Sequence, residues 1–376
     1  MIQMLDLRKE YEYMKREIDA AIKECLKHQQ WIWGPEVKQL EEAVAKYIGV
    51  KYCIGTSSGT DALLLCLRAL ALKFRNDEYF TREDEIITTP FTFTATGDAI
   101  IRAGATPVFI DVDEHTYNLD IVKVNKYLER YGNKVIGIVP VHLFGQGCNM
   151  TDLMMIAKKR RLFVVEDVAQ AFGGSWKDKK LGSYGIASAF SFFPSKNLGG
   201  YGDSGAVCTN DREVADIVMM LTKHGGKDKY NVDHIGYNAR LDTIQAAILL
   251  VKLRYVDEFN MRRRVIAKAY NVALKNIMYI ITPKALPDAY HIYHQYTIRI
   301  LDNKRDELMN KLKEADIATA VYYPVALHKM NLFMNKCIAI DGLDVAERLV
   351  KEVLSLPIEP LLTDEEIKKI VNIIKS

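Results

Sequence analysis

Residues 52–72 read YCIGTSSGTDALLLCLRALAL, in which a short apolar strand passes through small glycine, serine and threonine residues into an apolar helix. Strands followed by helical segments recur downstream, and we expect further strands at 85–88, 107–111, 135–142 and 162–166. Repeated strand–helix units are typical of a mostly parallel sheet covered by helices. The sequence therefore predicts an α/β protein built around such a sheet.

The flanking segments complete the expected domain organisation. Further helices are expected at 11–28, 35–48, 241–274, 305–315 and after Thr363, and further strands at 187–193, 205–209 and 295–301. The texture beyond residue 277 is α+β, so we expect a large domain with N-terminal helices over residues 1–250 and a smaller C-terminal domain over 251–376. The polar segment 73–84 is expected to be a solvated loop.

Composition and charge narrow the class of protein. The 376 residues include 51 Lys and Arg and 48 Asp and Glu, which gives a net charge of +3. A nucleic-acid-binding protein is expected to show a clear basic excess, so we expect no nucleic-acid partner. The N-terminal segment is charged, and no apolar stretch approaches the roughly 20 residues of a membrane-spanning helix. These features favour a soluble, cytoplasmic protein without a membrane partner.

The spacing of cysteines and histidines gives no reason to expect a metal. The six cysteines show no CxxC spacing and mostly lie among apolar residues, so we interpret them as reduced core residues. The eight histidines include no HExxH-type pair. These exclusions leave a large enzyme or a large binding protein as the expected class of protein.

Small residues at the start of the helix in 55–65 (GTSSGTDALLL) are candidates for an anion site. Backbone N–H groups at a helix N-terminus favour an anion, and Gly59 would let the backbone approach it closely. The alternative is that the serine and threonine residues only cap the helix.

Two further segments supply an acid and an amine. The apolar strand in LFVVEDVAQAFGG (162–174) delivers Glu166, Asp167 and Gln170 at its carboxyl end, where parallel sheets bind ligands. The alternative for these acids is a helix cap or a salt bridge. Lys196 lies in the aromatic- and glycine-rich loop of FSFFPSKNLGGYGDSGAV (190–207), where desolvation would lower its pKa and favour the free amine. The alternative is a solvated lysine.

Together these groups are what pyridoxal phosphate requires. The cofactor needs an anion site for its phosphate, an acid partner for its pyridine nitrogen and an amine for its aldehyde. Phe91 or Phe93, in the segment TTPFTFTATGDA, could cover the ring, or both could be ordinary core residues.

Five motifs occur in order that together resemble those of the DegT/DnrJ/StrS family of pyridoxal-phosphate-dependent nucleotide-sugar aminotransferases. They are SSGTDAL, TPFTFTAT, EDVAQAFG, SFFPSKNLGGYGDSGA and GYNARLDTIQAAIL. The resemblance covers nearly the whole chain. It implies a fold-type I aminotransferase: a large cofactor-binding domain with a mixed, mostly parallel seven-stranded sheet, a smaller C-terminal domain, and a homodimer with shared active sites.

The resemblance also implies roles for single residues. Lys196 matches the Schiff-base lysine, which also moves a proton during the reaction, and Asp167 matches the partner of the pyridine nitrogen. The remaining cofactor contacts that it implies are the phosphate ligands Gly59, Thr60 and Ser191, the stacking Phe93, Gln170 near the ring oxygen, and Asn238 reaching the phosphate from the other subunit.

The substrate contacts that we expect are Arg240, Tyr322, Tyr323 and His328. Arg240 could meet a carboxylate or a phosphate, or could form an ion pair at the interface. The segment TAVYYPVALHKM resembles a substrate-lining stretch that usually reads His-Tyr-Pro, and Tyr322 stands at the usual histidine position.

The resemblance implies transfer of an amino group from L-glutamate to a ketosugar linked to dTDP or UDP, at C3, in aminosugar or surface-glycan biosynthesis. The alternatives are a 4-ketosugar aminotransferase, or a dehydratase or regulator of the same fold. Dehydratases of this fold carry histidine at the lysine position, so Lys196 argues against that activity.

Overall fold

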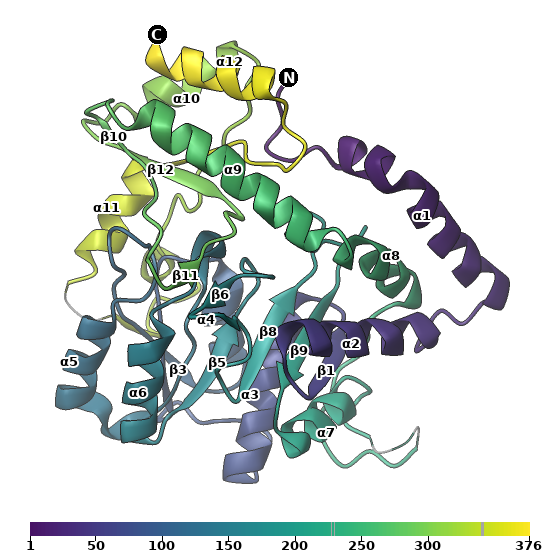
Figure 1. The fold of residues 1–376 in the computed structure, drawn as a ribbon. Helices are drawn as coiled ribbons and strands as arrows, with labels where there is room; N and C mark the ends of the chain where they lie inside the picture. The colour runs from purple at the N-terminus through teal and green to yellow at the C-terminus, as the bar shows by residue number, and fades with distance from the viewer. Residues whose placement is uncertain (227, 229, 340–341) are drawn as a thin grey trace.

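The computed structural model describes residues 1–226, 228, 230–339 and 342–376. Within them the centre is an eight-stranded sheet in the order β1-β9-β8-β5-β4-β2-β3-β13 (Figure 1). Its strands are β1 (Tyr52–Thr56), β2 (Glu85–Thr88), β3 (Thr106–Phe109), β4 (Val135–Ile138), β5 (Phe163–Asp167), β8 (Ala187–Ser191), β9 (Gly205–Thr209) and β13 (Ile338–Ala339). β9 is antiparallel to both of its neighbours, β1 and β8, and the other pairings are parallel.

Helices cover both faces of this sheet. The helices are α1 (Leu7–His28), α2 (Pro35–Ile48), α3 (Gly59–Arg75), α4 (Thr94–Arg102), α5 (Ile121–Tyr131), α6 (Met150–Arg160), α7 (Arg212–Leu221), α8 (Thr243–Leu253), α9 (Val256–Leu274), α10 (Arg305–Glu314), α11 (Asp344–Glu352) and α12 (Asp364–Lys375). α2, α5, α6 and α8 share a hydrophobic core with one face, and α3, α4 and α7 with the other.

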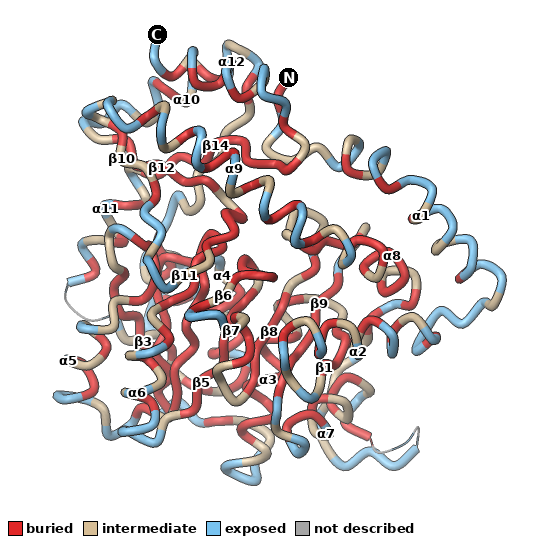
Figure 2. The backbone as a smooth tube through the Cα atoms, in the orientation of Figure 1, coloured by how far each residue is buried: buried red, intermediate tan, exposed pale blue. Residues whose placement is uncertain are grey.

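The alternation of side chains along a strand explains these two cores. Cys53 and Val164 belong to the first core, whereas their neighbours Ile54 and Val165 belong to the second. Because both faces are covered, the strands other than the edge strand β13 are mostly apolar on both sides, and Figure 2 shows them as mostly buried. The expected helix-covered, mostly parallel sheet is confirmed.

A smaller core lies at the end of the molecule where the termini meet (Figure 1). There α9, α10 and α12 pack with a three-stranded sheet of β10 (Ile280–Ile281), β12 (Tyr296–Ile300) and β14 (Val353–Leu356). As predicted, Thr363 caps the last helix, in a capping box with Glu366. Another small sheet joins β11 (Ala289–Tyr290) to β6 (Ser175–Trp176) and β7 (Lys179–Lys180).

The structure differs from the expectations in three places. The helix expected over 241–274 is two helices, because the N–H groups of Arg254 and Tyr255 bond to carbonyls three residues back and turn the chain. Segment 73–84 is not simply a solvated loop, since α3 extends to Arg75 and Phe80 is buried. The sheet gains an eighth strand because β13, from the C-terminal part of the chain, pairs with the edge strand β3.

The division near residue 250 stays a proposal. It falls close to the break between α8 and α9, and α9 carries residues of the smaller core. β11 and β13 nevertheless pair with strands from the first part of the chain, and Ile2 pairs with Ile317. No helix in the described ranges is long and apolar enough to cross a membrane.

Candidate active site

A cavity of about 660 Å³ lies beyond the carboxyl ends of β5 and β8 and against the start of α3. Ligands of parallel α/β sheets bind at this edge because the strand ends and the helix N-termini converge there. The structure brings together nine of the residues predicted from the sequence, which line this cavity: Gly59, Thr60, Phe93, Asp167, Gln170, Ser191, Lys196, Tyr322 and Tyr323.

Asp167, the last residue of β5, presents its carboxylate to this cavity. Its Oδ2 accepts a hydrogen bond from Thr96 Oγ1 (2.8 Å) and its Oδ1 accepts one from the Ala169 N–H (3.1 Å). Burial raises the pKa of Asp167, while these two hydrogen bonds and the charge of Lys196 oppose the rise. A carboxylate oxygen has two lone pairs, so the oriented group can still accept a further N–H.

The preceding residue, Glu166, has a structural role. Its carboxylate accepts N–H groups of Gly182 (2.8 Å), Tyr184 (2.7 Å) and Gly185 (2.8 Å), and it pairs with His142 Nε2 (3.0 Å). Asp167 therefore faces the cavity, as expected for a ligand-binding acid, whereas Glu166 forms the alternative, a salt bridge. The two differ because neighbouring residues of a strand point to opposite faces.

Lys196 lies in the loop between β8 and β9, with its backbone N–H bonded to Phe193 O (2.8 Å). It is partly exposed because it lines the cavity, yet the surrounding protein removes enough water to lower the pKa of its amine to about 8; Asp167 opposes that shift. At pH 7 about a tenth of the amine is therefore unprotonated, far more than in an ordinary lysine, which favours its use as a nucleophile.

The far wall of the cavity is the first turn of α3. A Cβ added to Gly59 would lie only 2.5 Å from Ser191 Cβ, so glycine lets the helix start approach β8 closely. Gly59, Thr60 and Ser191 are thereby adjacent, with the helix N-terminus facing the cavity. Ser58 caps α3 by accepting the Asp61 N–H (3.0 Å), and this cap leaves the helix N-terminus available to an anion.

The two candidate aromatic residues, Phe91 and Phe93, differ in exposure. Phe91 is fully buried, whereas Phe93 is 57% exposed and lies 6.4 Å from the Tyr323 ring between centroids. Of the two, Phe93 is therefore the one that can cover a ring in the cavity. Gln170 is fixed from both sides: its Oε1 accepts the Phe144 N–H (2.9 Å) and its Nε2 donates to the Tyr323 hydroxyl (2.7 Å).

Asn238 and Arg240 do not line the Lys196 cavity. They line an adjoining cavity of about 450 Å³ that also contains Asp203, a residue common to both cavities. Arg240 Nε is buried and has no hydrogen-bond partner among the described residues. A buried, unpaired guanidinium nitrogen is costly, which favours an anion at this position.

The expectation for His328 is not supported. Its side chain is buried and absent from the cavity lining, and its Nε2 bonds to Glu347 Oε1 (2.9 Å). The short turn after Tyr323 directs the ring toward α11, which carries Glu347. We therefore do not propose His328 as a substrate ligand.

Among the polar residues of this site that the sequence did not indicate, two have informative contacts. Thr96, three residues beyond Phe93 in the same motif, orients Asp167. His294 lines the cavity, and its Nδ1–H donates to Asn197 Oδ1 (2.9 Å), beside the lysine. Burial lowers the pKa of His294 well below its usual range, and Lys196 and Arg263 act in the same direction. Nothing local in the sequence marks His294, because it arrives from a distant segment.

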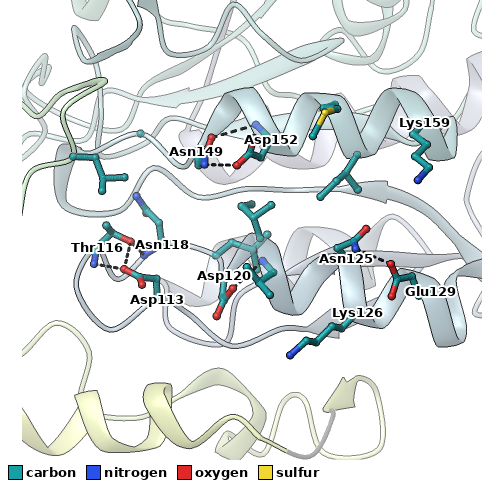
Figure 3. Close-up of a pocket in the computed structure, with 17 residues that line it drawn as sticks. Asp113, Thr116, Asn118, Asp120, Asn125, Lys126, Glu129, Asn149, Asp152 and Lys159 are labelled. Atoms are coloured by element: carbon teal, nitrogen blue, oxygen red, sulfur yellow. Dashed lines mark hydrogen bonds between the residues drawn. The ribbon is translucent and has the colours of Figure 1, made fainter.

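Figure 3 shows another cavity, of about 780 Å³, between α5 and α6. Two of its polar residues cap helices: Asp120 caps α5 and Asn149 caps α6. Its lining residues, all in the described part of the chain, include none that line the Lys196 cavity. We do not assign it a catalytic role.

The doubly covered sheet, with a lysine, a strand-end carboxylate and a helix N-terminus around one cavity, defines an α/β enzyme of the aminotransferase class. More specifically, the chain belongs to the DegT/DnrJ/EryC1/StrS aminotransferase family, whose sequence model matches residues 12–375.

Similar proteins span essentially the same length. The chain is 42% identical over 372 residues to a Geobacillus stearothermophilus protein named pleiotropic regulatory protein, covering 98% of this chain and 96% of that one. It is 39% identical over 368 residues to the UDP-2-acetamido-2-deoxy-3-oxo-D-glucuronate aminotransferase of Pseudomonas aeruginosa, covering 98% of each. Among solved structures, DesV of S. venezuelae in complex with a ketimine intermediate superposes with a TM-score of 0.93 at 35% identity, covering 100% of this chain and 97% of that one.

Proposed function

We propose that this protein is a pyridoxal 5'-phosphate-dependent aminotransferase that transfers an amino group from L-glutamate to C3 of a ketosugar linked to UDP or dTDP. The observation that carries the proposal is the single cavity that joins Lys196, Asp167 and the start of α3. Family membership supports the reaction class, and the relative that acts on a UDP-linked 3-oxo sugar supports the substrate class. The product would serve aminosugar or surface-glycan biosynthesis.

The residues of the cavity fit the cofactor. The close approach of Gly59 to Ser191 leaves backbone and hydroxyl donors for a phosphate, Asp167 keeps free lone pairs, and the Lys196 amine is desolvated. When bound, pyridoxal phosphate supplies an aldehyde that captures amines and a ring that accepts electrons. Phe93 would cover the face of that ring.

The chain's own groups would then share the work of proton transfer. Asp167 would hold the proton on the pyridine nitrogen, with Thr96 fixing the carboxylate in place. Lys196, with a pKa lowered to about 8, would take the proton from the substrate Cα and deliver it to the cofactor carbon. Tyr322 and Tyr323 would contact the sugar, and Arg240 a carboxylate or phosphate.

We further propose that the working unit is a homodimer in which Asn238 of one copy completes the site of the other. The support is that Asn238 lies outside the cavity of its own Lys196, in an adjoining cavity with Arg240, whose buried Nε has no hydrogen-bond partner in the described chain. A cytoplasmic location stays a prediction.

Substrate assays test the proposed function directly. We expect the cofactor-loaded protein to aminate nucleotide-linked 3-ketosugars with L-glutamate, and nuclear magnetic resonance of the product to place nitrogen at C3. Exclusive turnover of 4-keto isomers would establish the alternative 4-ketosugar aminotransferase. Failure to exchange amino groups between glutamate and 2-oxoglutarate would contradict the enzyme class and favour a regulator, the role in the name of the G. stearothermophilus relative.

Hybrid dimers test the shared site. Lys196→Ala removes the amine, and Asn238→Asp places a carboxylate against the expected phosphate, so each homodimer should be nearly inactive. A hybrid dimer, isolated through two different tags, would contain one doubly altered site and one intact site. We expect it to recover about half of the wild-type activity per dimer.

The control is a wild-type dimer that carries the same two tags and is isolated in the same way. If Asn238 acted within its own chain, each site of the altered hybrid would carry one lesion. An inactive hybrid would therefore contradict the shared site without contradicting the aminotransferase activity.

A further inference from the structure

Three potential metal ligands meet where α1 ends and α2 begins. Cys25 and His28 are three residues apart near the end of α1 and thus share one face of that helix. Glu36 arrives from the first turn of α2. One ligand atom from each of the three side chains lies within 4.8 Å of the other two.

The three side chains are well shielded from water. Cys25 is fully buried, and the side chains of His28 and Glu36 are only 20% and 13% exposed. Glu36 Oε1 accepts a hydrogen bond from His28 Nε2 (3.1 Å). Glu36 Oε2 is buried and has no hydrogen-bond partner in the described chain. An unsatisfied buried carboxylate oxygen is costly, so this pocket of polar atoms is incomplete without a further group.

The donor set is that of a transition metal. Thiolate, imidazole and carboxylate are the ligands that bind Zn²⁺, whereas Mg²⁺ and Ca²⁺ prefer oxygen alone. Tetrahedral Zn²⁺ places neighbouring ligand atoms about 3.3–3.6 Å apart, given its usual bond lengths. The present spacing within 4.8 Å therefore needs only small side-chain rotations.

We propose that Cys25, His28 and Glu36 form a three-ligand site for a divalent transition metal of the zinc type, with the fourth position left for water. The charges balance, because one thiolate and one carboxylate neutralise the divalent ion in a buried place. Glu36 Oε2 would gain the partner that it lacks. This site is separate from the Lys196 cavity and shares no residue with its lining.

Binding would release one proton, from the thiol of Cys25. The metal would take the place of the proton on His28 Nε2, and this single ring proton of the neutral imidazole would move to Nδ1. Nδ1 now accepts the Gln30 N–H (3.1 Å), and this exposed amide would have to turn toward water. Because binding releases a proton, occupancy should fall as the pH is lowered.

The site would fix the turn between the first two helices. Just beyond it, Ile32 forms a bridge with Asp242 and lines the Arg240 cavity, and the Gly34 N–H donates to Thr243 Oγ1 (3.0 Å). A metal held at the turn would therefore stabilise one wall of the cavity beside the active site. Its expected role is structural.

Cobalt and zinc titrations test the site. Tag-free, full-length, cofactor-loaded protein is treated with a chelator and then titrated with CoCl₂. We expect one Co²⁺ per chain with a near-ultraviolet thiolate-to-cobalt band, its displacement by ZnCl₂, and a higher Tm with Zn²⁺. Cys25→Ser should abolish the band, whereas Cys337→Ser, which changes a cysteine outside the cluster, should retain it.

No thiolate band in the wild type, or an unchanged band in Cys25→Ser, would overturn the proposal. If Cys25→Ser does not show the wild-type circular dichroism, Glu36→Gln carries the test instead. That change keeps the side-chain size and removes the charge, and we expect it to weaken Co²⁺ binding by at least about 100-fold, beyond the loss of an outer-shell partner. Unchanged affinity in Glu36→Gln would equally overturn the site.

Discussion

Lys196→Ala is expected to lower kcat/KM for glutamate-dependent amination by at least about 10⁴-fold, because it removes both the nucleophilic amine and the group that moves the proton. The proposed phosphate end of the cavity, lined by Gly59, Thr60 and Ser191, does not involve the lysine. We therefore expect the variant still to bind the cofactor, without the visible absorbance of the lysine-bound form. Single-turnover kinetics and absorbance spectra provide the measurements.

The matched control is Lys38→Ala, whose side chain is 82% exposed on α2 and is not part of the cavity lining. A second measurement needs no cofactor at all. Acylation of Lys196 in the cofactor-free protein should have its midpoint near pH 8, because burial lowers the pKa of that amine to about 8. Turnover in Lys196→Ala near the wild-type rate would refute the proposed role of the lysine. An acylation midpoint near the ordinary lysine pKa of about 10.4 would refute the desolvation of its amine.

Asp167→Asn is expected to lower kcat by roughly 10²–10³-fold, the range found when one preorganised electrostatic partner of a reaction is removed. Asparagine has nearly the same shape: its amide oxygen can accept the Ala169 N–H and its amide NH2 can donate to the Thr96 hydroxyl oxygen, so the fold and cofactor binding should persist. Its neutral amide no longer favours a proton on the pyridine nitrogen, which weakens the ring as an electron acceptor.

Cofactor stoichiometry and kcat measured on the same sample separate binding from catalysis. Asp98→Asn, on α4 and outside the cavity lining, is the matched control. Loss of cofactor binding alone, with normal kcat in the saturated variant, would assign Asp167 to binding and contradict its electronic role.

The structure brings predicted residues together where motif and strand direction coincide. Asp167 ends β5 and Lys196 follows the neighbouring strand β8, so the topology carries both to the same edge of the sheet. The pattern did not distinguish Glu166 from Asp167, because that choice depends on which face of the sheet holds the cavity. His328 lies outside the cavity lining, because proximity along the chain does not fix where a turn directs a side chain.

The sequence by itself determined the α/β class, the helix-covered sheet and the chemistry around Lys196, because the strand and helix periods and the motif spacings are local properties of the chain. Only the tertiary structure decided which groups meet across distant segments. It placed His294 beside the lysine loop, separated Arg240 from the cavity, and joined Cys25 and His28 to Glu36 across a turn. The physical reason is that such contacts depend on how helices pack against each other and against the sheet, and packing is set by the whole core.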